Sequence, residues 1–390
     1  MPRGVWALGF VSLFMDISSE MIHGLLPVFL TTVLGASAEM VGLIEGVGEA
    51  TASITKLVSG WISDKIGKRK TLTIIGYGLG TLSKPLFALA PTASFVLGAR
   101  FSDRLGKGIR GAPRDAIVGD IVPSGQRGAA YGLRQALDTV GAFSGPLLAI
   151  ALMAVLHNNF RLVFWLALIP GLISVLVLVL GVREPVHQKI ETHAPVELKD
   201  IKTIGTAYWV VVGVGAVLTL ARFSEAFLIL RAQTAGLWLA LAPLVLVVMN
   251  IVYALSSYPL GSLSDRFDRK LMLAIGFATL IVADLVLAIA PTLPIVMVGI
   301  ALWGLHMGMT QGLLSALVAD EAPHHLRATA FGVFNFASGV ALLLASLIAG
   351  FLWEQIGPSA TFVAGAVFTA VGLFALVVTA RENFEWRKRQ

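Results

Sequence analysis

Long apolar segments alternate with short polar connectors along the whole chain. A membrane-spanning helix needs about 20 mainly apolar residues, and the chain offers twelve stretches of that length. Charged residues fall inside several stretches without shortening them. The pattern predicts an all-α integral membrane protein with twelve transmembrane helices, at residues 5–31, 39–62, 70–91, 94–120, 128–155, 160–182, 205–230, 236–260, 270–290, 294–320, 328–353 and 358–380.

Repeated motifs divide these spans into two pseudo-symmetric halves of six helices. GDIVPSGQRGAAYG at 119–132 recurs as ADEAPHHLRATAFG at 319–332, and the same offset aligns Lys84 with Asp284. A duplication of like topology is typical of transporters with a binding site between two parallel halves. We therefore predict four regions: an N-terminal half at 1–182, a cytoplasmic linker at 183–204, a C-terminal half at 205–380 and a cytoplasmic tail at 381–390.

Basic residues are concentrated in alternate connectors. They include DKIGKRK at 64–70, KDIK at 199–202, DRFDRK at 265–270 and the C-terminal RKRQ. The connectors between them, such as APTAS and APTLP, have almost no Lys or Arg. Because basic loops stay in the cytoplasm, we expect a multi-pass protein of the inner (plasma) membrane with both termini cytoplasmic.

Composition agrees with a membrane protein. Hydrophobic residues make up 56% of the 390 positions and charged residues only 13%, against about 25% charged in soluble domains. The formal net charge of +6 is spread over membrane connectors, so we expect a lipid bilayer and no nucleic acid as the surroundings. Cysteine is absent from the sequence, which excludes disulfides and thiolate metal sites.

The fourth predicted span carries an unusual charged face. Between Arg100 and Asp115 it holds seven charged residues. At about 100° per residue they lie within an arc of about 140°. A charge at mid-bilayer costs at least ~2.5–3.5 kcal/mol, so such residues face the bundle interior or water. This span is therefore expected to line a polar cavity.

Neighbouring spans place further charges on single helix faces. The first span has Asp16 and Glu20 close in angle to His23, and the second has Glu45 and Glu49. Acids among bases in a cavity can load and release protons, and we expect the proton-coupling acids to be Asp16, Glu20, Glu45, Glu49 and Asp138. We expect the substrate to be bound by Lys84, Arg100, Asp103, Arg104, Lys107, Arg110, Arg134, Arg222, Glu225, Asn250 and Asp284.

The repeated loop motifs resemble those of the major facilitator superfamily. Gly60, Asp64, Gly67, Arg69 and Lys70 are similar to its GxxxDxxGxRK signature, and the resemblance covers essentially the whole chain. The second copy of the loop has Asp268 where the first has Gly67, and Arg100 falls where many members carry an arginine. The stretch Gly141 to Pro146 resembles the GxxxGP pattern of the antiporter branch. The resemblance implies that conformational gating involves Gly60, Asp64, Gly67, Arg69, Gly141, Gly145, Pro146, Asp265 and Arg269.

These observations predict a proton-coupled secondary active transporter that works by alternating access. The basic residues of the third and fourth spans favour export of a small organic anion, such as a carboxylate or a siderophore-like chelate. No P-loop and no HExxH or GxSxG motif occurs, so we expect neither an ATP-driven pump nor an enzyme. We expect no cofactor beyond the proton gradient, no resident metal, a small-molecule substrate and a monomer.

Three alternatives remain open from the sequence. The acids of the first two spans would also suit a proton/drug antiporter for amphipathic cations. Glu45, Glu49, Asp16 and His23 would suit a divalent-metal exporter, because carboxylates and imidazole bind such ions. A membrane receptor or scaffold that transports nothing is the third alternative, and it belongs to a different functional class of membrane protein.

Overall fold

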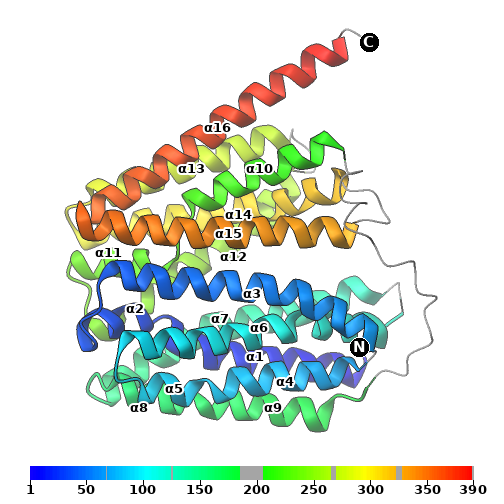
Figure 1. Cartoon of the computed structure of the whole chain (residues 1–390), viewed down its shortest axis with the longest axis vertical. Helices are drawn as coiled ribbons and strands as arrows, with labels where there is room; N and C mark the ends of the chain where they lie inside the picture. The colour runs from blue at the N-terminus through cyan, green and yellow to red at the C-terminus, as the bar shows by residue number, and fades with distance from the viewer. Residues whose placement is uncertain (67, 124–125, 185–204, 265–268, 322–326, 389–390) are drawn as a thin grey trace. The chain divides into compact units, whose positions relative to one another are not determined.

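Helices account for all the regular secondary structure among the described residues. The computed structural model describes residues 1–66, 68–123, 126–184, 205–264, 269–321 and 327–388. Figure 1 labels the helices, whose bounds are α1 Arg3–His23, α2 Leu26–Val28, η1 Phe29–Val33, α3 Ala38–Ile66, α4 Arg69–Leu82, α5 Lys84–Leu89, α6 Ala93–Ile121, α7 Arg127–Val155, α8 Phe160–Leu166, α9 Leu168–Gly181, α10 Thr206–Ala221, α11 Ala226–Thr234, η4 Leu239–Leu241, α12 Leu244–Ser264, α13 Arg269–Ile289, α14 Leu293–Glu321, α15 Arg327–Gln355 and α16 Pro358–Lys388.

Each predicted span lies on one helix or on consecutive helices. Most observed ends fall within a few residues of the predicted ones. The main difference is at 236–260, where α12 begins only at Leu244. Pro243 immediately precedes it, and a proline is well suited to the start of a helix, where its missing N–H is not needed. At the other end of the chain, α16 continues as one helix through Lys388.

Ten helical segments of the described chain are long and apolar enough to cross a membrane. The other two long helices, α3 and α6, each have 29 residues and exceed the length that a bilayer requires. They fall outside that set because they carry the charged faces predicted above. Charge, and not length, therefore separates α3 and α6 from the other helices.

Prolines explain three breaks between helices of the N-terminal part. The breaks α1/α2, α4/α5 and α8/α9 lie just before Pro27, Pro85 and Pro170. A proline lacks the N–H that would bond to the fourth residue before it, and its ring clashes with that carbonyl. The break at Pro85 makes Lys84 the first residue of α5, which determines the direction of the Lys84 side chain.

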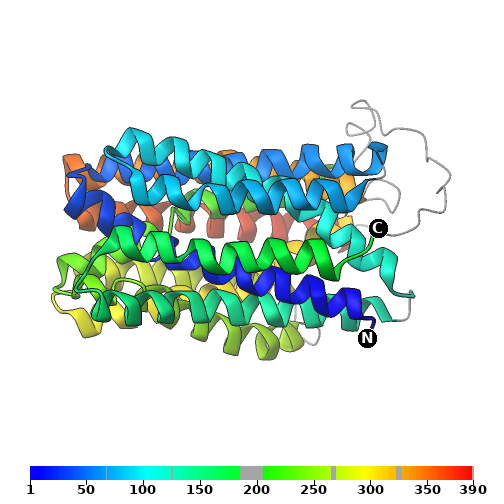
Figure 2. The same ribbon diagram turned by 90° about the horizontal axis from the view of Figure 1, so that it is seen from below.

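The chain divides into two compact units. The first comprises Met1–Thr192 with Trp238–Leu244, and the second comprises His193–Leu237 with Val245–Gln390. In the first unit α1 packs against α7 and α9, and α6 packs against α3 and α4; Figure 2 shows α1 beside α9. In the second unit α13 packs against α14 and α16. The predicted linker 183–204 lies mostly outside the described residues, and the predicted boundaries of the halves stay a prediction.

Candidate functional site

The charged face of α6 points into the interior of the first unit. Arg100, Asp103, Arg104 and Arg110 are each at most 5% exposed. Small residues let the neighbouring helices approach this face: a Cβ on Gly106 would lie 2.7 Å from the carbonyl oxygen of Gly76 on α4. Because no side chain fits there, α4 and α6 cross with their backbones in contact. The buried arginines are therefore held on a closely packed pair of helices.

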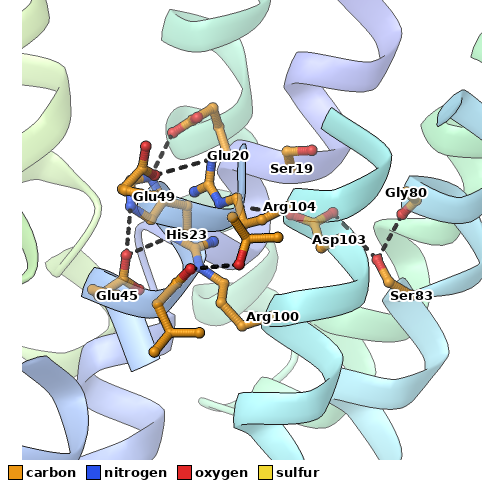
Figure 3. A network of polar contacts seen from close by, with 12 residues as sticks. Ser19, Glu20, His23, Glu45, Glu49, Gly80, Ser83, Arg100, Asp103 and Arg104 are labelled. Carbon is orange, nitrogen blue, oxygen red and sulfur yellow. Dashed lines mark hydrogen bonds and ion pairs between the residues drawn. The ribbon is translucent and has the colours of Figure 1, made fainter. Parts of the chain in front are cut away.

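Arg100 forms a buried ion pair with Glu45 of α3. Its Nη2 lies 2.5 Å from Glu45 Oε2, and the two side chains are 3% and 1% exposed. His23 of α1 links this pair to a second acid. Its Nε2 lies 3.7 Å from Glu45 Oε2 and its Nδ1 lies 3.3 Å from Glu20 Oε2. Figure 3 shows these side chains converging, so that polar contacts connect α1, α3 and α6.

Arg104 makes a second contact to α3 one turn further along. Its Nη1 lies 3.2 Å from Glu49 Oε1, and the Glu49 side chain is 30% exposed. Gly48 stands beside Glu49, and a Cβ there would meet Arg100 Cγ at 3.1 Å and Arg104 Cγ at 3.2 Å. Glycine at this position therefore lets both arginine stems pack on α3. The Arg104–Glu49 pair is the more open of the two α3–α6 pairs.

Lys84 and Asp103 form a third buried pair. Lys84 Nζ donates to Asp103 Oδ1 at 2.7 Å and to Ser19 Oγ at 3.0 Å. Ser83, at the break between α4 and α5, donates to the same carboxylate oxygen at 3.2 Å (Figure 3). The proline break described above thus positions both Ser83 and Lys84 on Asp103. We call the residues of these three pairs, with Glu20 and His23, the α6 network: Glu20, His23, Glu45, Glu49, Lys84, Arg100, Asp103 and Arg104.

A second cluster of charges joins α6 to α7. Arg134 Nη1 donates to Asp138 Oδ2 at 2.8 Å within α7. Arg114 of α6 lies 3.8 Å from Asp138 and 3.1 Å from its neighbour Asp115. Arg114 also donates to Ser12 of α1 at 2.9 Å. Asp138, predicted to couple protons, and Arg134, predicted to bind substrate, are therefore partners of each other and lie apart from the α6 network's three pairs.

Lys107 differs from the other bases of α6. It is exposed, and no ion pair joins it to another side chain in the part of the chain that the structure describes. Arg104, Glu49, Glu20 and Asp16 all act on it electrostatically. A lysine that is surrounded by charges and still open is available to a ligand. Among the predicted substrate-binding bases of α6, Lys107 is therefore the best placed to meet a solute.

Asp16 is an acid that, like Lys107, forms no ion pair with a described residue. Its side chain is partly buried, and within the described residues it makes no ion pair. Lys107, Arg110 and Asp138 act on it electrostatically. Arg110 itself places its guanidinium 4.7 Å from the ring centroid of Tyr77. The structure thus brings Asp16, Lys107 and Arg110 to the same side of the first unit as the α6 network.

The predicted gating glycines of α7 pack against α1. A Cβ on Gly141 would lie 2.6 Å from the carbonyl oxygen of Leu13 and 2.9 Å from Asp16 Cβ. A Cβ on Gly145 would lie 2.8 Å from Glu20 Cβ. Pro146 follows inside the continuous helix. Contacts of this kind let helix backbones approach closely, and here they determine how near α7 lies to the two acids of α1.

The signature loop after α3 is described only in part. Arg69 Nη1 lies 2.5 Å from Asp120 Oδ2, so that the start of α4 is joined to the end of α6. Gly60 faces Ala112 of α6, where a Cβ would be in ordinary contact at 3.4 Å. The remaining predicted gating positions, Asp64, Gly67, Asp265 and Arg269, lie outside the residues or side chains that the structure describes.

The predicted site residues of the second unit come from α12, α13 and the break between α10 and α11. Arg222 and Glu225 flank the break between α10 and α11. Asn250 lies on α12 and is partly buried. Asp284 on α13 is 0% exposed. Arg222 and Glu225 act on each other electrostatically, and the carboxyl oxygens of Asp284 have no hydrogen-bond partner among the described residues.

Several residues in the clusters were not predicted as site residues. His23 lies between two predicted acids, and its position on the face of Asp16 and Glu20 was the available signal. Arg114 and Asp115 belong to the predicted charged face of α6. Asp120 sits in a repeated motif, because it aligns with Asp320. Ser19 and Ser83 have no signal in the sequence, since serine is common in membrane helices and its partners depend on helix packing.

Within the described residues no group of three or more His, Asp or Glu side chains is arranged to hold a metal ion. The acids of the α6 network are instead engaged by arginine, lysine and histidine.

A bundle of membrane-length helices with buried charge pairs defines a class of protein, because charges inside a bilayer mark solute or ion pathways. The class is the polytopic membrane transporter. The chain belongs to the Major Facilitator Superfamily, whose sequence profile matches residues 8–249 and 223–390. The family predicted from the loop motifs is therefore confirmed.

Individual relatives agree with this assignment. An uncharacterized MFS-type transporter of Methanocaldococcus jannaschii is 34% identical over 390 residues, with 97% of this chain and 95% of that protein covered. The multidrug efflux pump Tap of Mycobacterium bovis is 34% identical over 124 residues, which is 32% of this chain and 30% of the pump. The crystal structure of a POT family transporter in complex with a thioalcohol-conjugated peptide superposes with a TM-score of 0.82 at 14% identity, covering 98% of this chain and 97% of that one.

Proposed function

We propose that this protein is a proton-coupled secondary active transporter that exports a small organic anion by alternating access. The observation that carries the proposal is Lys107, an exposed base without an ion pair among the described residues, set beside a buried network of acids and bases. A carboxylate on the solute would supply the missing partner of this lysine. Charge-assisted hydrogen bonds of that kind are about twice as strong as neutral ones.

The balance of charges supports proton coupling. Around the α6 network and its neighbours lie five acids, Asp16, Glu20, Glu45, Glu49 and Asp103, and five basic residues, Lys84, Arg100, Arg104, Lys107 and Arg110. His23 contacts two of the acids. The formal charges of the acids and bases balance when His23 is neutral, so either a bound proton or a bound anion would change that balance. Proton and substrate would therefore influence each other's binding.

Alternating access follows from this linkage. A proton or solute shifts the equilibrium between two conformations only by its differential affinity for them. Protonation of Glu49 would break the open Arg104–Glu49 pair and so change which conformation is favoured. The glycine contacts between α7 and α1 and the Arg69–Asp120 pair would be the elements that the change rearranges.

The proposed membrane topology is the one that the sequence predicts. It has twelve transmembrane helices in two six-helix halves, with α3 and α6 spanning the membrane as charged helices inside the bundle. Both termini would be cytoplasmic, the protein would lie in the inner membrane as a monomer, and it would catalyse no chemical reaction. Support comes from the family assignment and from the basic residues of alternate connectors, which the positive-inside rule places on one side of the membrane, the cytoplasmic side.

A proton/drug antiporter for amphipathic cations is the second candidate. Asp16 favours it, because this partly buried acid makes no ion pair in the described chain and would suit a cationic solute. Tap, the relative that matches part of this chain, is described as a multidrug efflux pump. The two candidates differ in the sign of the solute, and this difference can be measured directly.

The test uses the full chain in liposomes with a trapped pH dye. Organic anions and lipophilic cations are added in turn to wild type, Lys107→Gln and the control Lys65→Gln. Lys65 is also an exposed lysine, and it lies over the Trp61 ring at 4.9 Å near the end of α3. Lys65→Gln therefore controls for the loss of one exposed positive charge.

The proposal expects proton movement with anions that is lost in Lys107→Gln and retained in Lys65→Gln. Movement with cations alone, unchanged in Lys107→Gln, would overturn the anion assignment and favour the drug antiporter. If neither solute moves protons, uptake of radiolabelled anions without a pH gradient separates an uncoupled anion carrier from a protein that does not carry anions.

A further inference from the structure

Asp284 of α13 is a buried carboxyl group that the charge network of the first unit does not involve. It is 0% exposed, and neither of its oxygens has a hydrogen-bond partner among the described residues. In a membrane helix, an acidic side chain in this position ordinarily pairs with a base or faces water. Asp284 does neither in the conformation described here.

The surroundings of Asp284 are apolar and close. A Cβ on Gly365 of α16 would lie 2.6 Å from Asp284 Oδ2 and 3.2 Å from the ring of Phe223. Phe223 in turn packs on Trp303 and Phe362, with ring centroids 5.3 and 5.4 Å apart. The carboxyl group therefore lies against a glycine backbone and next to a group of aromatic rings.

The internal repeat shows what has changed at this position. Asp284 aligns with Lys84, and Trp303 aligns with Asp103. In the first unit Lys84 and Asp103 form an ion pair of 2.7 Å. In the second unit the acid, Asp284, occupies the position that corresponds to Lys84. Trp303 occupies the position that corresponds to Asp103. The duplicated position has thus lost the compensating charge and kept an ionisable group.

Among the described residues, no charged group on the neighbouring elements forms a hydrogen bond with Asp284. His306 of α14 donates from Nδ1 to the Gly276 carbonyl oxygen at 2.9 Å. Arg231 of α11 donates to the carbonyl oxygens of Leu287 and Ala290. Glu225 and Tyr253 act electrostatically on Arg222, whose Nε has no hydrogen-bond partner in the described chain. In the described part of the second unit, no charged side chain acts electrostatically on Asp284.

We propose that Asp284 is a proton-binding site of the second unit, occupied in this conformation so that the side chain is a neutral carboxylic acid. An isolated ionised carboxylate in apolar surroundings costs far more free energy than a neutral one, and such groups bind a proton instead. The proton comes from water and returns to water when α13, α16 and the aromatic rings separate. A metal cation is not the ligand, because it would require several oxygen donors.

This site is independent of the proposed transport function. Asp284 was predicted from the sequence to bind substrate, and its full burial instead favours a ligand as small as a proton. The α6 network would couple protons to the solute, whereas Asp284 would respond to the opening of the second unit. If the α6 network does not couple protons to the solute, the assignment of Asp284 is unaffected, and the reverse also holds.

Infrared difference spectroscopy tests the proposal on the full chain in lipid bilayers. At neutral pH the wild type should show a protonated-carboxyl C=O band that shifts when water is replaced by D2O. The band should be lost in Asp284→Asn, whose side chain has nearly the same shape. It should remain in Asp120→Asn, a control that removes an acid paired with Arg69.

Identical bands in wild type and Asp284→Asn at neutral pH would overturn the proposal. A second variant keeps the test valid if Asp284→Asn does not fold. In Gly365→Ala the new methyl group would lie 2.6 Å from Asp284 Oδ2 and must displace the carboxyl group, so the C=O band should shift. An unshifted band in a folded Gly365→Ala protein would also contradict the assignment.

Discussion

Glu45 on α3 and Arg100 on α6 form an ion pair of 2.5 Å in which neither side chain is more than 3% exposed. Removing one partner of a buried pair leaves an uncompensated charge, at a cost of about 3–5 kcal/mol. The pair also has His23 beside it, so that its loss would affect contacts to α1. This relationship makes the pair a structural element of the first unit as much as a candidate for proton transfer.

Glu45→Gln should lower the thermal unfolding temperature strongly, because Arg100 stays buried without its carboxylate. The double variant Glu45→Gln with Arg100→Gln should be more stable than the sum of the two single effects predicts, since neither charge remains. Tryptophan fluorescence during heating in detergent measures both. Glu354→Gln, at an exposed position near the end of α15, is the control. Strict additivity of the two single effects would contradict a direct pair.

Glu49→Gln should behave differently, because Glu49 is 30% exposed and its pair with Arg104 is longer, at 3.2 Å. We expect a smaller loss of stability than in Glu45→Gln, because Asp103 still lies 3.9 Å from Arg104, together with loss of transport driven by a pH gradient. Exchange of labelled for unlabelled solute, which needs no net proton movement, should continue. Gradient-driven transport and solute exchange are both measured on the same liposome preparation. Retention of gradient-driven transport would exclude Glu49 as the coupling acid.

Gly141→Ala should destabilise the protein by about 1–3 kcal/mol, the usual cost of overpacking. The new methyl group would meet the Leu13 carbonyl oxygen and Asp16 Cβ on α1, which would push α1 and α7 apart. Gly132→Ala on the same helix is the matched control, because a Cβ there meets nothing within 4 Å. Alanine favours helix over glycine by about 1 kcal/mol, so this control should be neutral or slightly stabilising. Equal effects in both variants would refute the close contact.

Arg69→Gln should reduce the transport rate with little change in stability. The carboxylate that remains, that of Asp120, is 27% exposed, so water can hydrate it after Arg69 is replaced. If the pair stabilises one conformation of the cycle, the exchange Arg69→Asp with Asp120→Arg should recover much of the rate. Transport and thermal unfolding are measured on the single and exchanged variants. A rate that stays low after the exchange would mean that Arg69 acts through other contacts.

Much of the fold can be predicted from the sequence because membrane helices depend on local features. Length and apolarity define a span whatever surrounds it, and the predicted spans lie on observed helices. The charged face of α6 was predictable for the same reason, since an angle of about 100° per residue is a property of any α-helix. Helix breaks near Pro27, Pro85 and Pro170 also have local causes.

Partner choice within the site was not predictable from spacing. The sequence places Arg100, Asp103, Arg104 and Lys107 on one face, and every acid of the first two spans is a conceivable partner. In the structure Arg100 pairs with Glu45, Arg104 with Glu49 and Asp103 with Lys84. Lys107 is exposed and forms no ion pair with a described residue. These choices depend on the rotation and the distance between helices, which Gly48, Gly76 and Gly106 set through backbone contact.

The sequence by itself determined that this is a multi-pass membrane protein of the Major Facilitator Superfamily with a charged fourth span, because hydropathy, loop motifs and helix periodicity are properties of short segments. Only the tertiary structure decided which acid meets which base, and that Asp284 lies against a glycine and near aromatic rings without a partner among the described residues. Contacts between helices far apart in the chain arise from packing, and packing depends on all the helices of a unit at once.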